Sequence, residues 1–198
     1  MNIKDTRILG PVLALLAAVL GILAILPAAS QAKTAEFGAD LTGTFTPVDD
    51  PQPCFFAGSC TRVGLYYDVP THLGETPNAP KDGVIKKISL VALDSGDLKI
   101  QLAKAKGVSP ASSEIKIVSQ GPKLSFDGDG SVETFKVHIP VKKGQWLAFK
   151  SKLASTIACG SGFDTEAQFQ PPLQVGGPFG IASSTSDCTS LIGAVMKY

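Results

Sequence analysis

The chain has 198 residues, with 18 Lys and Arg against 17 Asp and Glu, so its formal net charge is +1. A charge this close to zero gives no concentrated basic excess for binding nucleic acid, and we expect no nucleic-acid partner. Hydrophobic residues make up 44% of the chain. This excludes an intrinsically disordered protein, which has too little apolar surface to offset its ordering entropy. The length favours one domain.

The N-terminus has the three parts of a secretory signal peptide. Lys4 and Arg7 precede a long uncharged apolar run, and small residues occupy the −3 and −1 positions of a cleavage site that ends at Ala32. We expect residues 1–32 to be a signal peptide and residues 33–198 to form a single secreted or cell-surface domain. The apolar run is also long enough to cross a bilayer. Membrane contact is therefore expected only if the leader stays uncleaved.

All four cysteines lie beyond the expected cleavage point. An even number of cysteines in an exported chain predicts disulfides, and four cysteines allow three pairings. We expect the local pairing, Cys54 with Cys60 and Cys159 with Cys188, because each pair brackets a segment rich in turn formers. The chain has no C-x-x-C pair and no histidine near a cysteine in sequence, so we predict neither a metal nor another cofactor.

Apolar residues alternate with polar ones along most of the chain after residue 40, which is the period of half-buried strands. The alternating segments are 63–69, 87–92, 98–103, 114–117 and 135–139, and segment 191–197 is apolar on both faces. Gly- and Asp-rich turn formers separate them at 80–83, 94–97, 127–130 and 142–145. The pattern predicts an all-β chain that folds as a single β-sandwich, jelly-roll or Greek-key-like, of roughly eight to ten antiparallel strands.

The alternation also predicts which side chains face the core. We expect one set to be buried: Leu98, Ile100, Leu102, Phe135, Val137 and Ile139. We expect the intervening set to be exposed: Lys99, Gln101, Lys136 and His138. Segments 48–60 and 160–180 lack a strand pattern, and we expect both to be long ordered loops.

Several motifs together resemble a loosely defined group of exported actinobacterial β-sandwich proteins that have no assigned function. They are a Gly-Ala-Asp-Leu-Thr-Gly stretch at 38–43, a cysteine pair that ends in Ser59-Cys60-Thr61, a Pro-Lys-Asp-Gly turn at 80–83, and Lys-Gly-Gln-Trp at 143–146. The chain departs from the group at Ile88, where a tryptophan is usual. The resemblance implies export and a sandwich fold, and it implies no catalytic residues.

Catalytic motifs are weak in this sequence. No G-x-S-x-G elbow occurs, and a serine nucleophile would need His72, in a Pro-flanked loop, or His138, on the outer face of a strand, as its base. Glycoside hydrolysis needs two carboxylates, and Asp164 and Glu166 are the nearest such pair. A hydrolase acting on extracellular polysaccharide is therefore the alternative function.

Two binding sites have some support in the sequence. Asp127, Asp129 and Glu133 place carboxylates at alternate positions and are a candidate calcium site, although Asp-Gly more often marks a hairpin turn. Tyr66 and Trp146 are candidates for outward-facing rings that stack on sugars. We therefore expect an exported binding or structural module without catalytic activity, with a cell-surface or extracellular glycan as its partner.

Overall fold

The computed structural model describes residues 32–39, 41, 58–65, 77–107, 113–152 and 157–198. The predicted signal peptide up to residue 31 lies outside the described residues, as do Cys54, Tyr66 and His72. Contacts divide the chain into Met1–Ala32 and Lys33–Tyr198, and all the strands belong to the second unit. No helix in the described ranges is long and apolar enough to cross a membrane.

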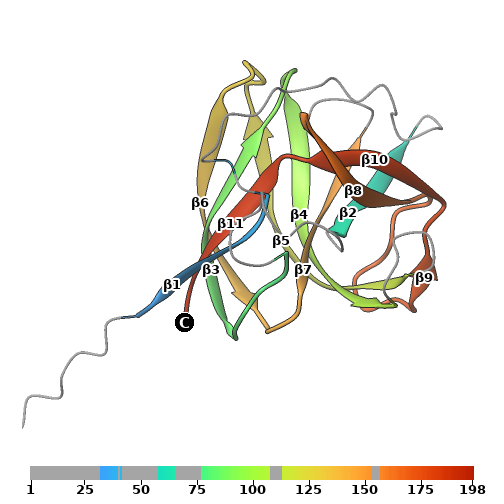
Figure 1. Cartoon of the computed structure of the whole chain (residues 1–198), viewed down its shortest axis with the longest axis horizontal. Coiled ribbons are helices and arrows are strands. Elements are labelled where there is room, and N and C mark those ends of the chain that lie inside the picture. The colour runs from blue at the N-terminus through green and yellow to red at the C-terminus, as the bar shows by residue number, and fades with distance from the viewer. Residues whose placement is uncertain (1–31, 40, 42–57, 66–76, 108–112, 153–156) are drawn as a thin grey trace, which may run out of the picture. The chain divides into compact units, whose positions relative to one another are not determined.

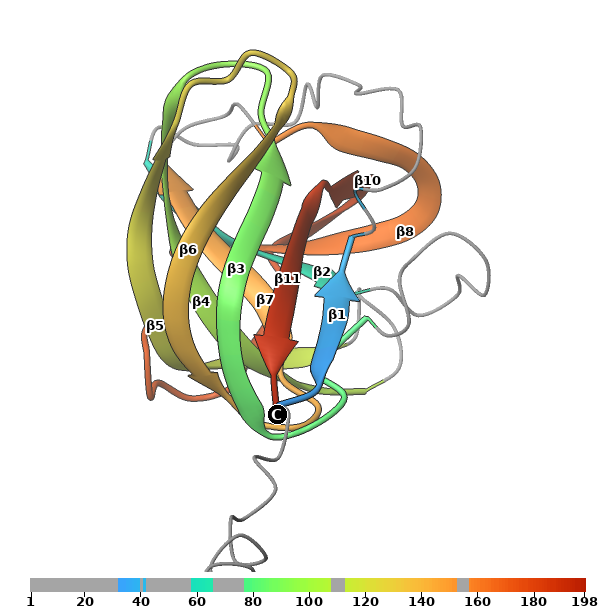
Figure 2. The same cartoon turned by 90° about the vertical axis from the view of Figure 1, so that its left-hand side faces the viewer.

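The domain is a sandwich of two antiparallel sheets, as the alternation predicted (Figure 1). The four-stranded sheet has the order β1-β11-β3-β6, and its strands are β1 (Thr34–Gly38), β11 (Ile192–Lys197), β3 (Gly83–Val91) and β6 (Val132–Val141). Figure 2 looks onto this sheet, with β4, β5 and β7 of the second sheet behind it.

The seven-stranded sheet has the order β10-β8-β2-β7-β4-β5-β9. Its strands are β10 (Ser184–Ser190), β8 (Cys159–Phe169), β2 (Ser59–Leu65), β7 (Trp146–Lys152), β4 (Gly96–Lys106), β5 (Glu114–Phe126) and β9 (Gly180–Ile181). The eleven strands in the described ranges exceed the eight to ten expected. In the order of the described strands, the chain passes between the sheets six times, for example from β5 to β6 and from β10 to β11.

The main core fills the space between the sheets. Leu98, Ile100 and Leu102 of β4 and Ile139 of β6 are buried in it, as predicted. Phe135 and Val137 are half-buried and pack against the same cluster. Lys136 and His138 are exposed, which confirms the predicted orientation of β6.

A second apolar cluster lies on the other face of the seven-stranded sheet. It includes Val63, Ala103 and Ile117, and residues 170–182, here called the cover segment, pack over it through Leu173 and Ala182. The segment is held by the Gly176 N–H, which donates to the Ile117 carbonyl at 2.9 Å. Part of this outer face is therefore buried, which an alternating pattern does not reveal.

The cover segment explains why one exposure prediction is wrong. Gln101 is 1% exposed, whereas we expected it in solvent. The Thr61 hydroxyl donates to Gln101 Oε1 at 3.2 Å and accepts from the backbone N–H of Leu173 at 3.2 Å. The polar side chains of Thr61 and Gln101 are thus satisfied beneath the cover segment.

The expectation of a long loop over residues 160–180 is also wrong in its first half. Residues 159–169 form β8, which pairs with β2 on one side and β10 on the other. On β8 the residues Glu166 and Gln168 alternate with Ala167 and Phe169, and all four are buried. A strand that is buried on both faces usually has apolar residues on both. The polar residues of β8 therefore prevented its recognition as a strand from the sequence.

Of the other expected loop, 48–60, only its end is described: Ser59 and Cys60 belong to β2, and residues 48–57 lie outside the described ranges.

Candidate functional site

Each of the two sheets carries a groove on its surface in the described part of the chain. The first, of about 170 Å³, is lined mainly by apolar groups of β1 and β11, with Glu36 and Ser89 as its polar side chains. The second, of about 550 Å³, lies on the seven-stranded sheet. Only the second falls within the usual size of ligand sites, about 300–1,000 Å³, and it is the candidate site.

The second groove, here called the lysine groove, crosses four neighbouring strands. It is lined by Ser59 of β2, Lys150 and Ser151 of β7, Asp97, Leu98 and Lys99 of β4, and Gln120 and Lys123 of β5. These strands are consecutive in the sheet order β2-β7-β4-β5. Seven of its eight lining residues have polar side chains, three of these are lysines, and none of the eight is aromatic.

Strand register places the three lysines of the groove in one row. Lys99 lies directly opposite Lys123 of β5 on one side and Lys150 of β7 on the other. Residues directly opposite each other in antiparallel strands project from the same face, with Cβ atoms about 4.5–5.5 Å apart. The backbone therefore fixes three ammonium-bearing side chains side by side on the outer face of the sheet.

Two of these charges have no carboxylate partner in the part of the chain that the structure describes. Lys123 Nζ lies 2.7 Å from Asp97 Oδ2, and the other oxygen of Asp97 accepts a hydrogen bond from the Ser125 hydroxyl. Lys99 and Lys150 are half-buried and form no ion pair with any described residue. Like charges placed directly opposite in a sheet are destabilising. Proteins tolerate such local conflicts chiefly at functional sites, so the row points to an anionic ligand.

The row ends at both sides after the three lysines. Beyond Lys150 the next residue in register is Thr61 of β2, which is buried under the cover segment. Beyond Lys123, the neighbour of β5 is the short β9, which pairs only with Glu114 and Ile115. The uncovered cationic surface therefore spans three strands.

The other polar groups of the groove can bind neutral parts of a ligand. The hydroxyls of Ser59 and Ser151 and the amide of Gln120 each donate and accept hydrogen bonds. Sugar hydroxyls also do both. The lysines of the groove can thus bind the anionic groups of a ligand, and its hydroxyl and amide groups can bind the hydroxyls of the same ligand.

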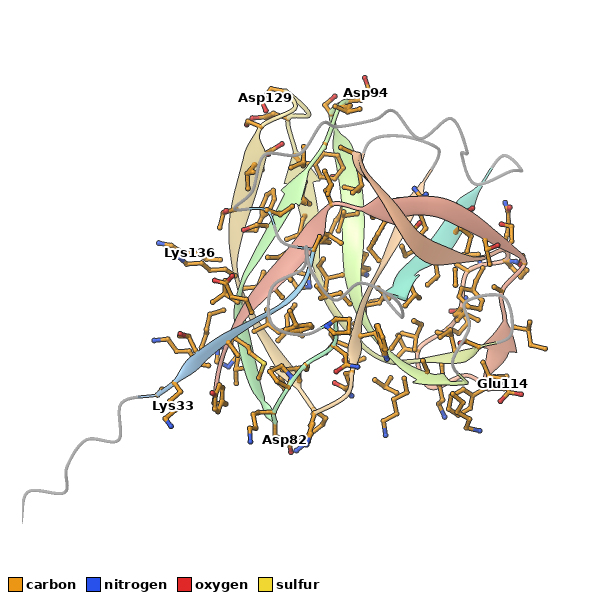
Figure 3. The ribbon with its side chains drawn as sticks, in the orientation of Figure 1. Lys33, Asp82, Asp94, Glu114, Asp129 and Lys136 are labelled. Atoms are coloured by element: carbon orange, nitrogen blue, oxygen red, sulfur yellow. The ribbon has the colours of Figure 1, made fainter. Side chains whose placement is uncertain are left out.

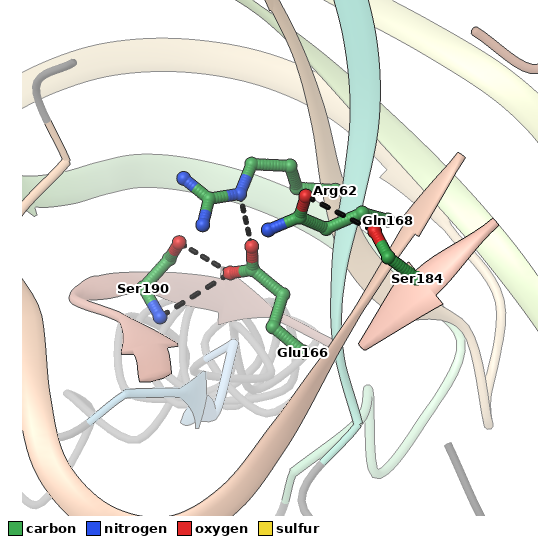
Figure 4. A network of polar contacts seen from close by, with 5 residues as sticks. All are labelled: Arg62, Glu166, Gln168, Ser184 and Ser190. Atoms are coloured by element: carbon green, nitrogen blue, oxygen red, sulfur yellow. Dashed lines mark hydrogen bonds and ion pairs between the residues drawn. The ribbon is translucent and has the colours of Figure 1, made fainter. Parts of the chain in front are cut away.

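A second polar cluster is buried at the other end of the seven-stranded sheet (Figure 4). Arg62 of β2 pairs through Nε with a carboxylate oxygen of Glu166, and the Ser190 hydroxyl and backbone N–H donate to the other oxygen. The Ser184 hydroxyl donates to Gln168 Oε1 at 3.5 Å. Both charged side chains are nearly inaccessible to solvent. The cluster joins β2, β8 and β10 and is structural.

The predicted calcium residues serve the turn between β5 and β6 instead. The Glu133 carboxylate accepts the backbone N–H groups of Asp127 and Gly128 at 3.0 and 3.1 Å. Asp129 accepts the Ser131 hydroxyl and N–H, and these bonds hold the pKa of Asp129 below its usual value. Within the described ranges, no group of three His, Cys, Asp or Glu residues is placed to hold a metal.

This turn packs against the neighbouring one. Gly128 has a φ of +72°, and a Cβ at this position would lie 1.9 Å from the backbone carbonyl carbon of Asp94. Figure 3 shows Asp94 and Asp129 at the same end of the sandwich. Only glycine allows this approach, so the packing of the two turns accounts for glycine at position 128.

The expected aromatic surface for sugar stacking is not present at Trp146. The Trp146 ring belongs to the second apolar cluster and is 7% exposed. Its side chain does point away from the inter-sheet core, but the cover segment packs over that cluster. The expectation of an open stacking surface at Trp146 is therefore wrong. Tyr66 lies outside the described residues.

Neither groove pairs two carboxylates, which glycoside hydrolysis requires. Asp97 is the carboxylate of the lysine groove and Glu36 that of the smaller groove. Glu166 is buried and ion-paired, and the side chain of Asp164 is outside the description. His138 is exposed on β6 and contacts Lys86 Nζ through Nδ1 at 3.0 Å. The hydrolase alternative gains no support from these positions.

The described cysteine agrees with an oxidised domain. Cys60 is buried and disulfide-bonded. The side chains of Cys159 and Cys188 and all of Cys54 lie outside the description, so the predicted pairing stays a prediction.

Comparison with known proteins adds no further assignment. No protein-family model matches the chain, and a search of curated proteins finds no significant similarity. The lysine groove is therefore the feature from which a function can be inferred.

Proposed function

We propose that this protein is an exported, non-enzymatic binding module that takes an acidic extracellular carbohydrate in the lysine groove. The single observation that carries the proposal is the cross-strand row of Lys123, Lys99 and Lys150, in which two ammonium groups have no carboxylate partner among the described residues. An anionic ligand relieves the repulsion within the row, because its charges compensate those of the unpaired ammonium groups when it binds.

Three further features favour a carbohydrate outside the cytoplasm. The leader has the pattern of a secretory signal, and the disulfide at Cys60 is typical of an oxidising compartment. The groove is open and shallow enough to cross four strands, which suits an extended polymer. Its hydroxyl and amide groups match sugar hydroxyls.

Binding of the purified protein to polygalacturonate, by isothermal titration calorimetry at low salt, tests the proposal. We expect binding that weakens as salt is added, because the contact is between exposed charges. Unsubstituted dextran should give no heat of binding. The variant Lys99→Glu should bind about tenfold more weakly or worse.

The matched control is Lys136→Glu, which reverses an exposed lysine on the outer face of the four-stranded sheet. It should bind like the wild type. Equal binding of dextran and polygalacturonate, or equal losses in the two variants, would contradict the proposal. Tighter binding of inorganic polyphosphate than of polygalacturonate at equal charge would assign the groove to a phosphate polymer instead.

A further inference from the structure

We infer that the ligand of the lysine groove is a linear acidic polysaccharide that lies across the strands, with a charge on each successive sugar and three charged sugars in contact. The inference rests on the proposed function. It adds the orientation, the charge spacing and the length of the bound segment.

The orientation follows from the lining of the groove. Strands β2, β7 and β4 each contribute a run of only one to three residues, and the groove crosses all three and continues onto β5. Four strands spaced about 4.8 Å apart give a length of about 14 Å across the sheet. Three consecutive residues give about 7 Å along a strand. An extended polymer therefore fits across the strands better than along them.

The charge spacing follows from the register. Each of β5, β4 and β7 places one lysine in the row, so the cationic side chains recur with the spacing of the strands. A linked chain of pyranose rings advances by a similar distance for each ring. A lysine has a long and flexible stem, so it can reach a carboxylate on either side of the polymer. Lys123 already pairs with Asp97, but its ammonium has three N–H donors and can also bind a ligand carboxylate. A charge on every ring therefore faces each of the three lysines, whereas a charge on every second ring leaves Lys99 unpaired.

The length follows from the ends of the row. Thr61 continues the row on β2 but is buried, and its hydroxyl is occupied by Leu173 and Gln101. On the opposite side, β5 carries the last lysine, Lys123. A fourth charged ring therefore meets no further lysine of this row.

Titration calorimetry with galacturonate oligomers of one to six sugars tests the inference, with hyaluronan oligomers of the same lengths as the second probe. Hyaluronan carries a carboxylate on every second sugar. We expect the affinity for galacturonate oligomers to rise about threefold to fivefold for each sugar up to three. Beyond three sugars it should gain only from the number of possible registers. Hyaluronan oligomers should bind more weakly at equal length.

Variants locate the ends of the row. In Lys150→Gln the affinity for galacturonate oligomers should stop rising with length at two sugars. In the control Lys136→Gln it should still stop rising at three. Affinity that climbs steadily to six sugars, or equal affinity for the two polymers at equal length, would overturn the inference while leaving the proposed function in place. Failure of all the anionic oligomers to bind would instead remove the proposed function, so the two failures are distinguishable.

Discussion

Arg62 of β2 and Glu166 of β8 form an ion pair in the protein interior, where the Glu166 side chain is fully buried and the Arg62 side chain is 8% exposed. A buried pair of this kind gains little over apolar residues, because both charges lose their hydration. Loss of one partner alone is costly, because it leaves the other charge buried without compensation. This relationship makes the junction of β2 and β8 sensitive to single substitutions.

Glu166→Gln should therefore lower the free energy of unfolding by about 3–5 kcal/mol, since it keeps the shape and leaves the Arg62 charge uncompensated. Urea denaturation measures the change. The control Ser184→Ala removes only a 3.5 Å contact to Gln168 and should cost about 1 kcal/mol or less. The double variant Arg62→Met with Glu166→Met should be more stable than Glu166→Gln. Equal stability of Glu166→Gln and wild type would refute the buried-pair interpretation.

The bridging hydroxyl of Thr61 anchors the cover segment. Thr61→Val keeps the shape but leaves the Leu173 N–H and Gln101 Oε1 without this partner, so we expect a loss of about 1–3 kcal/mol in the free energy of unfolding. Hydrogen exchange at the Leu173 amide should accelerate. Thr134→Val, at an exposed hydroxyl that contacts Ser89, should have a smaller effect. Unchanged exchange at Leu173 would show that the segment is held by other contacts.

The lysine row should reduce stability while it serves binding. Lys99→Gln removes the central like charge, so we expect the free energy of unfolding to rise by about 0.2–1 kcal/mol, the range of a single cross-strand pair. The same variant should bind polygalacturonate more weakly. Lys81→Gln, at an exposed lysine outside the row, should change neither quantity. A less stable Lys99→Gln protein would mean that the three lysines do not repel one another in the folded state.

How far the sequence predicts this fold depends on where polar residues lie. The alternation of Leu98, Ile100 and Leu102 correctly identified the core face of β4, because apolar burial drives that pattern. The same alternation wrongly predicted that Gln101 is exposed, and it did not identify β8 as a strand. Glu166 in particular is buried by pairing, and a period-two pattern treats every polar residue as exposed.

The candidate site could not be predicted from the sequence for a different reason. Lys99, Lys123 and Lys150 lie on three strands far apart in the sequence, and only the strand register brings them into one row. A local pattern shows each as an ordinary exposed strand lysine. By contrast, the turn at Asp127 and Asp129 was predictable, since Asp-Gly has a local conformational preference.

Strand register also bears on the disulfides. Cys188 of β10 is paired with Ser161, and Cys159 of β8 with Ser190, so the two cysteines occupy adjacent strands, two residues apart in register. Cys60 is the second residue of β2, beside the opposite end of β8. We therefore still expect Cys159 with Cys188 and Cys54 with Cys60. Protease mapping of the unreduced protein should give these two linked pairs, and a peptide joining Cys60 to Cys188 would contradict them.

The most direct test of the lysine groove is a nuclear magnetic resonance titration of the ¹⁵N-labelled protein with trigalacturonate. We expect amide shift changes to concentrate at Ser59, Lys99, Gln120 and Lys150, on four neighbouring strands of the seven-stranded sheet. Amides around Lys87 and Lys136 on the other sheet should stay unchanged. Changes confined to the four-stranded sheet, or no changes at a saturating concentration, would contradict it.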